Sequence, residues 1–239
     1  MLKFYINTLV RLFGYQFVKK QTLSYLINTN HFKWFRDLQI KTIIDIGANE
    51  GQFALAMNNG IPDATFYSFE PLKECFDALK KNTTNIKHIE YFNYALGEVE
   101  DEQIINHNEY SPSSSFLKMG DLHKSVFPNT SNTIMEKIKI KSLDSFYGKI
   151  LFEKKVLLKI DVQGYELNVL KGAKKILKKT DIIIIETSFF SLYEGQPLFH
   201  DIYEYLISEN FSYYGNFEQL ANPHDGQILQ ADAIFLKNS

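Results

Sequence analysis

The sequence predicts an α/β fold built around a mostly parallel sheet, and three observations support this. Short apolar segments rich in β-branched and aromatic residues alternate with helical patterns, which is typical of βαβ units. Glycines mark the turn between the first apolar segment and its helix, and an acidic residue ends several of the apolar segments. A chain of 239 residues with 45% hydrophobic content is large enough to bury a core of its own.

The first half of the chain alternates regularly between strands and helices. A strand is predicted over 42–46, where "TIIDI" is apolar and β-branched. A helix is predicted over about 51–58, where apolar residues recur at helical spacing. The same alternation predicts a strand over 64–70, a helix over 72–82 and a strand over 89–96.

The second half begins with an interruption and then returns to this alternation. Residues 107–135 contain two prolines, many Ser and Thr residues and little periodicity, so a loop insertion is predicted there, between the segments 102–106 and 137–146. Loops of this length inside a compact domain are usually functional or disordered. The remaining elements are predicted as strands over 155–162, 181–189, 211–217 and 231–238 and as helices over 164–177 and 198–210, which gives seven principal strands.

Charge and cysteine content narrow the class of protein. A formal net charge of −2 provides no long-range attraction to nucleic acid, so no nucleic-acid partner is expected. A single cysteine, Cys75, excludes an internal disulfide and indicates a reducing compartment. A cytoplasmic protein is therefore the default expectation.

The first 38 residues are predicted to form an N-terminal helical segment, before a domain that covers 39–239. Apolar residues recur at helical spacing within residues 1–20. Lys3 and Arg11 interrupt the apolar stretch, which argues against a signal peptide, and the segment is too polar to span a bilayer comfortably. We expect an amphipathic helix packed on the domain, with a peripheral membrane contact as the alternative.

Four acidic residues, Asp45, Glu70, Asp161 and Glu186, end apolar strands and are expected to converge. The carboxyl ends of the strands in an open α/β sheet line its ligand crevice. Acids also cap helices, but Asp45 and Glu70 occur together with the glycines. Glu70 follows Gly47 by 23 residues, close to the separation at which a second-strand acid binds a ribose in dinucleotide sites. The ligand is therefore expected to contain adenosine.

The glycine turn, residues 45–51, indicates which adenosine ligand is bound. It has the pattern D-x-G-x-x-x-G, which lacks the Gly-Lys-Ser/Thr of a phosphate-binding loop and departs from the G-x-G-x-x-G of dinucleotide folds. The turn contains no basic residue, and Asp45 and Glu50 would repel a pyrophosphate but favour an ammonium or sulfonium centre. S-adenosylmethionine (SAM) meets these conditions, with its ribose at Glu70 and its amino-acid end at the turn.

Five segments, taken together, resemble the FkbM-type family of SAM-dependent methyltransferases. They are "IIDIGANEGQF" (43–53), "FEP" (69–71), "NYALG" (93–97), "LKIDVQGYELNVLKGA" (158–173) and "IIIIE" (182–186), within a resemblance that covers roughly residues 40 to 237. The family implies a Rossmann-like class I methyltransferase fold: a seven-stranded, mostly parallel sheet with an antiparallel last strand and helices on both faces. It also implies methyl transfer, usually to oxygen atoms of sugars or related small natural products.

The resemblance assigns the cofactor site residue by residue. It places the methionine part of SAM on the glycine turn, the ribose on Glu70, and the adenine against the residues after Glu70 and around "NYALG". Asp161 and Gln163 would line the face where the methyl group is transferred, and Ser114 would either close over the cofactor or belong to a polar linker. The predicted cofactor set is Asp45, Gly47, Ala48, Asn49, Gly51, Phe53, Glu70, Pro71, Leu72, Asn93, Ala95, Ser114, Asp161 and Gln163.

Three residues are candidates for the base that takes the proton of an acceptor hydroxyl. Asp161 is the first candidate, because it ends a strand beside the expected methyl position; Glu186 and His200 follow. A His in a helix is more often an ordinary packed residue. Asp161 and Glu186 could instead hold Mg²⁺, but a third ligand is not evident, so no metal site is assigned.

The predicted function is O-methylation of a sugar hydroxyl in glycan, polysaccharide or natural-product biosynthesis, with a small-molecule or glycan acceptor. Several aromatic residues near the ends of two strands suit sugar rings or apolar acceptors, or are simply core: Tyr165, Phe189, Phe190, Tyr193 and Phe199. The alternatives are a methyltransferase acting on a lipid, peptide or other non-sugar acceptor, and a non-catalytic protein that binds an adenosine ligand. The oligomeric state is not predicted.

Overall fold

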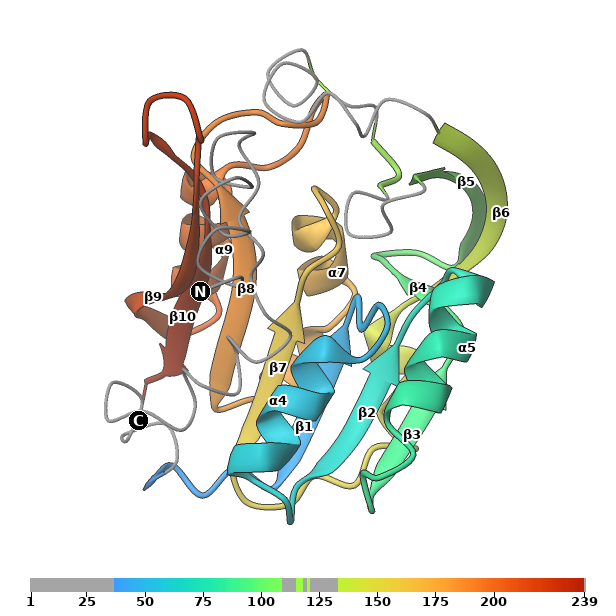
Figure 1. The fold of residues 1–239 in the computed structure, drawn as a ribbon. Coiled ribbons are helices and arrows are strands. Elements are labelled where there is room, and N and C mark those ends of the chain that lie inside the picture. Colours follow the sequence, from blue (N-terminus) through green and yellow to red (C-terminus); the bar gives the residue numbers. More distant parts are fainter. Residues whose placement is uncertain (1–36, 109–114, 118–119, 121–132, 239) are drawn as a thin grey trace, which may run out of the picture.

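A seven-stranded sheet forms the centre of the computed structural model, which describes residues 37–108, 115–117, 120 and 133–238 (Figure 1). Its strands are β1 (Thr42–Ile46), β2 (Thr65–Phe69), β3 (Ile89–Phe92), β7 (Val156–Ile160), β8 (Ile182–Ser188), β9 (Phe211–Ala221) and β10 (Ile228–Lys237). They lie in the order β3-β2-β1-β7-β8-β10-β9. Neighbouring strands from β3 to β8 are parallel, whereas β10 is antiparallel to both β8 and β9. The predicted sheet and its antiparallel last strand are confirmed.

Helices cover both faces of this sheet because its strands are apolar on both sides. Figure 1 shows α4 (Gln52–Gly60) and α5 (Lys73–Asn82) on one face, with α7 (Glu166–Lys171) and α9 (Phe199–Ser208) on the other. Alternate residues of β1 enter two separate cores: Ile43 packs with residues of α4, and Ile44 and Ile46 pack with residues of α7 and α9. This layering leaves the carboxyl ends of the parallel strands free to form a site.

The single strand predicted over 89–96 is wrong, because two strands in different sheets occupy this range. β3 ends at Phe92, and β4 (Ala95–Leu96) joins a second sheet of order β4-β6-β5 with β5 (Asp101–Asn108) and β6 (Thr133–Lys141). Between β3 and β4, the side-chain amide of Asn93 donates hydrogen bonds to the carbonyls of Glu70 (2.9 Å) and Pro71 (2.8 Å). These bonds hold the chain where it leaves the main sheet.

The single helix predicted over 164–177 is also wrong. α7 ends at Lys171, and a separate short helix, α8 (Lys174–Leu177), follows Gly172. A Cβ at Gly172 would lie 2.0 Å from the carbonyl oxygen of Gly97, so the two backbones are in close contact there. The Asp144 carboxylate, in the 3₁₀ turn η4 (Leu143–Phe146), accepts the N–H groups of Lys175 and Ile176 and starts the second helix.

Parts of three predictions lie outside the described residues. The predicted loop 107–135 is shorter in the structure, because β5 extends to Asn108 and β6 begins at Thr133; most of the residues between them lie outside the described part. Residues 1–36 also lie outside it, so the N-terminal helical segment 1–38 and its membrane contact stay predictions. Among the helices that the structure describes, none has the length and apolar character to cross a membrane.

Candidate active site

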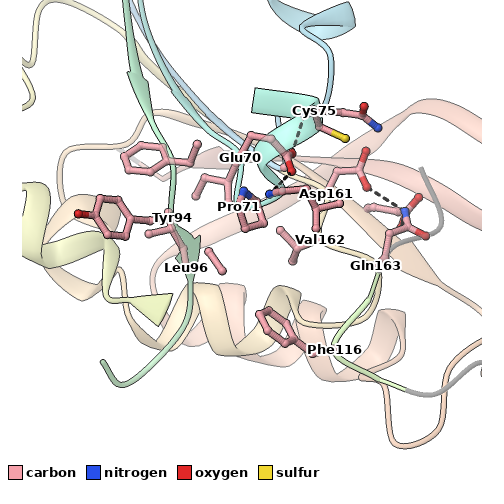
Figure 2. Close-up of a pocket in the computed structure, with 16 residues that line it drawn as sticks. Glu70, Pro71, Cys75, Tyr94, Leu96, Phe116, Asp161, Val162 and Gln163 are labelled. Carbon is pink, nitrogen blue, oxygen red and sulfur yellow. Dashed lines mark hydrogen bonds between the residues drawn. The ribbon is translucent and has the colours of Figure 1, made fainter. Parts of the chain in front are cut away.

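A pocket of about 220 Å³ opens at the carboxyl ends of the parallel strands (Figure 2). Residues at or just after the ends of β1, β2 and β7 line it, together with residues of β4, β8 and the insertion between β5 and β6. The lining residues are Ile46, Gly47, Asn49, Phe69, Glu70, Pro71, Leu72, Cys75, Tyr94, Ala95, Leu96, Phe116, Asp161, Val162, Gln163 and Glu186. The pocket therefore lies at the edge of the sheet where the acidic strand ends were predicted to meet.

The glycine turn after β1 forms one wall and depends on Gly47. Gly47 has a φ of +73°, and a Cβ there would lie 1.8 Å from the carbonyl oxygen of Asp161. No other residue fits without moving one of the two segments. The N–H groups of Gly47 and Ala48 both donate to the carbonyl of Phe69 at 3.0 Å. The turn is thus packed between the ends of β2 and β7.

Glu70, directly after β2, offers two acceptor positions to the pocket. Its side chain is buried, and each carboxylate oxygen accepts one backbone N–H at 2.9 Å, from Asn49 and from Leu72. Each oxygen keeps a second lone pair for a further donor. Burial raises the pKa of Glu70 to about 7, although these hydrogen bonds act in the opposite direction. Two neighbouring ribose hydroxyls match this arrangement of acceptors.

An apolar end of the pocket lies next to Glu70. Leu72, Cys75 and Ala95 belong to one buried cluster, and Phe116 packs against it. Pro71 and Leu96 also line this end, as Figure 2 shows. A flat aromatic base such as adenine fits an apolar surface of this kind.

Asp161 and Glu186 line the pocket together, and Gln163 bridges them. The Gln163 amide nitrogen donates to Asp161 Oδ1 (3.0 Å) and to Glu186 Oε2 (2.8 Å), while the Tyr193 hydroxyl donates to Gln163 Oε1 (2.8 Å). Both amide protons are therefore used. Burial, followed by the charge of Asp161, raises the pKa of Glu186 well above its usual value. The bridge holds the two carboxyl groups side by side at the pocket.

Asp45 lies beneath the glycine turn, where it does not line the pocket. It is fully buried in β1 and forms an ion pair with Lys159 on the neighbouring strand β7, with Asp45 Oδ1 and Lys159 Nζ 3.4 Å apart. Burial raises the pKa of Asp45, and the Lys159 charge partly opposes this. The contact expected between Asp45 and the methionine part of SAM stays a prediction. From its place beneath the turn, Asp45 would act on the cofactor indirectly, through the turn.

The other predicted residues divide into three groups. Ala48, Gly51 and Phe53 lie in or beside the turn without lining the pocket, and Asn93 supports the carbonyls of Glu70 and Pro71 from outside it. His200 is exposed on α9, where it lies 3.4 Å from Glu204, and does not line the pocket. Ser114 lies outside the described residues.

The insertion between β5 and β6 contributes Phe116, a pocket residue that was not predicted from the sequence. The Ser115 hydroxyl donates to the carbonyl of Gln163 at 2.5 Å and accepts the N–H of Leu117 at 3.0 Å. Phe116, between them, lines the pocket with its ring 4.8 Å from that of Tyr165. Phe116 and Leu117 are two adjacent apolar residues in an otherwise polar stretch. This pattern is the signal that could have identified Phe116.

No group of three or more His, Cys, Asp or Glu side chains that could hold a metal ion is present in the part of the chain that the structure describes. The carboxyl groups of Asp161 and Glu186 are bridged by the side-chain amide of Gln163 and not by a third acid.

Residues 45–213 match the family described as "Methyltransferase FkbM domain". This chain belongs to the FkbM methyltransferase family. The match confirms the resemblance inferred from the sequence motifs. With it, the predicted enzyme class, a methyltransferase, and the predicted cofactor, SAM, are confirmed for this chain.

Two curated relatives and one solved structure show how far the similarity extends. "Methyltransferase 1" of Beauveria bassiana (strain ARSEF 2860) is 30% identical over 142 residues, which cover 54% of this chain and only 57% of that protein. "2-O-methyltransferase NoeI" of Sinorhizobium fredii is 28% identical over 178 residues, 70% of this chain and 71% of that protein. Magnesium protoporphyrin IX methyltransferase (ChlM) from Synechocystis PCC 6803, solved with bound SAM, has a TM-score of 0.50. That comparison covers 92% of this chain and 79% of ChlM at 9% identity, so it shows a likeness of fold alone.

Proposed function

We propose that this protein transfers the methyl group of SAM to a hydroxyl group of a sugar, in a glycan, a polysaccharide or a natural product. The observation that carries the proposal is the pair of carboxyl groups, Asp161 and Glu186, held together at the pocket by Gln163. A hydroxyl acceptor must lose its proton during methylation, and a carboxylate within hydrogen-bond reach accepts it. In an O-methyltransferase, one carboxylate of this pair would accept the proton of the acceptor hydroxyl.

The residues that line the pocket fit SAM from end to end. Glu70 would hold the ribose, the apolar cluster beside it would hold the adenine, and the glycine turn would receive the amino-acid end. When bound, SAM supplies an activated methyl group on a positively charged sulfur. None of the described residues that line the pocket is basic, and three of them are acidic. This lining favours a positively charged sulfur over a phosphate.

Asp161 is the better candidate for the base, as the sequence suggested. The Asp161 side chain is 36% exposed, and its Oδ2 lies 3.5 Å from Lys159 Nζ. Burial raises the pKa of Glu186, which disfavours its charged form. Asp161 would thus accept the proton of the acceptor, with Glu186 as the second candidate.

Two observations favour a sugar over other acceptors. The family resemblance points to sugars and related small molecules, and a relative 28% identical to this chain is named a 2-O-methyltransferase. The aromatic residues predicted to stack on a sugar are mostly committed elsewhere: Tyr193 is buried against Gln163, Tyr165 contacts Phe116, and Phe189 packs on Phe199. Phe190, 38% exposed, stays available for such a contact.

Methyl transfer to a defined panel of acceptors tests the proposal. The purified protein is incubated with methyl-labelled SAM and with sugar nucleotides and glycans, and in parallel with lipids and peptides. Labelled sugar product that disappears in Asp161→Asn and persists in Asp63→Asn, an aspartate whose side chain is 85% exposed, supports the proposal. Transfer to lipids or peptides alone overturns the sugar assignment. SAM binding without transfer to any acceptor indicates a binding protein.

A further inference from the structure

Lys159 is a charged residue in the middle of the sheet. It lies on β7, between β1 and β8, and is 8% exposed. Its neighbours on the strand are apolar, and the ring of Phe53 from α4 lies 5.7 Å from its ammonium nitrogen. Lysine is almost never buried this deeply unless it is paired. Its partners therefore indicate why a lysine occupies this position.

Three oxygen atoms surround the ammonium group. Lys159 Nζ donates a hydrogen bond to the carbonyl oxygen of Gly47 at 3.0 Å, and it lies 3.4 Å from Asp45 Oδ1 and 3.5 Å from Asp161 Oδ2. An ammonium group has three protons, so each oxygen can receive one. Although burial acts against the charged form, the charges of Asp161 and Asp45 raise the pKa of Lys159. The lysine is thus held as a cation under the pocket floor.

These contacts join two segments of the described chain. Asp45 and Gly47 belong to β1 and its glycine turn, whereas Asp161 ends β7 on the pocket side. In the described part of the chain, neither oxygen of Asp45 accepts a well-aligned hydrogen bond, so its ion pair with Lys159 is what compensates its burial. The backbones are already in contact, since a Cβ on Gly47 would overlap the carbonyl of Asp161.

We propose that Lys159 is a positioning residue for the cofactor: its ammonium group holds the Gly47 carbonyl, and with it the glycine turn, against the end of β7. The inference rests on SAM as the ligand of the proposed function, but it does not depend on the acceptor. The turn would receive the amino-acid end of the cofactor, whereas Glu70 and the apolar cluster would hold the adenosine. Loss of Lys159 should therefore weaken recognition of the amino-acid end alone.

Two adenosine ligands with an uncharged sulfur distinguish this positioning role from a general effect on folding. S-adenosylhomocysteine carries the amino-acid end, whereas methylthioadenosine has the same adenosine and a neutral sulfur but lacks that end. In Lys159→Met, calorimetry should show S-adenosylhomocysteine binding weakened about tenfold, as expected for hydrogen bonds to charged groups that lose alignment. Methylthioadenosine should bind within about twofold of the wild type. Lys155→Met is the matched control, because Lys155 forms an exposed ion pair with Asp181 at the other end of β7.

If Lys159→Met folds poorly, the double variant Asp45→Asn/Lys159→Met provides the same test. It should melt at a higher temperature than Lys159→Met, because no carboxylate is left buried without its partner. The selective loss of S-adenosylhomocysteine binding should persist in it. Equal losses for both ligands, no loss for either, or recovery of binding together with stability would each overturn the positioning role. None of these results depends on whether sugars are methylated, so failure of the acceptor proposal remains a separate outcome.

Discussion

The Glu70 carboxylate accepts the backbone N–H of Asn49 at 2.9 Å, and this hydrogen bond joins the end of β2 to the glycine turn after β1. The same carboxylate accepts the N–H of Leu72 through its other oxygen. Two halves of the expected cofactor site, one for the ribose and one for the amino-acid end, therefore share one side chain. Changes at Glu70 should affect ligand binding more than any other single change in the pocket wall.

Glu70→Ala should weaken SAM binding by about 1 to 3 kcal/mol, the usual effect of losing hydrogen bonds to a charged group. Isothermal titration of the purified variant measures this directly. Glu74→Ala, an exposed acid in the first turn of α5, is the control and should bind as the wild type does. Unchanged affinity in Glu70→Ala would remove this residue from the ribose site.

SAM affinity should fall as the pH is lowered through about 7. Burial raises the pKa of Glu70 to about 7, so its carboxylate loses its charge, and one of its acceptor positions, as the pH falls below about 7. Below that pKa, the affinity should decrease by up to about tenfold per pH unit, since binding then requires removal of a proton. Titrations between pH 5.5 and about 8 measure the slope. Glu70→Gln should bind more weakly at pH 8 and show a flatter profile; an equally steep profile would assign the titration to another group.

Phe116→Ala should weaken the binding of adenosine ligands by about 0.5 to 1.5 kcal/mol, the range for loss of an aromatic contact. The ring lines the pocket and packs on the cluster of Leu72, Cys75 and Ala95. Methylthioadenosine and SAM should be affected alike, in contrast to the Lys159 variant. Phe190→Ala provides an aromatic control outside the pocket lining. A loss in the control as large as that in Phe116→Ala would contradict the assignment.

Asp161→Asn should lower kcat by about a hundred- to ten-thousand-fold while leaving SAM affinity nearly unchanged. The amide keeps the size of the side chain but cannot accept the acceptor's proton. Once an acceptor is known, steady-state rates and calorimetry on the same preparation separate the two effects. A wild-type rate would direct attention to Glu186, and loss of cofactor binding would place Asp161 among the binding residues. Loss of wild-type activity in EDTA and its return with Mg²⁺ would make the carboxylate a metal ligand.

Local patterns in the sequence were sufficient for the main sheet and for the residues of the glycine turn. Most of the seven strands are short apolar segments with their own turn signals, so their type could be inferred without knowledge of their neighbours. Gly47 and Glu70 could be identified in the same way, because the pattern D-x-G-x-x-x-G and the acid after the next strand are both local features. The split of residues 89–96 could not, since it depends on hydrogen bonds from Asn93 to residues of another strand end.

Only the tertiary structure decided which acids share the pocket and what holds them. Asp45 and Lys159 are neighbours because β1 pairs with β7, and this pairing follows from the order of strands in the sheet and not from spacing along the chain. The bridge from Gln163 to Asp161 and Glu186 requires β7 and β8 to be adjacent, and the entry of Phe116 requires the insertion to dock on Gln163. Hydrophobic periodicity specifies which residues are buried, but a charged or polar residue finds its partner only when distant segments are packed together.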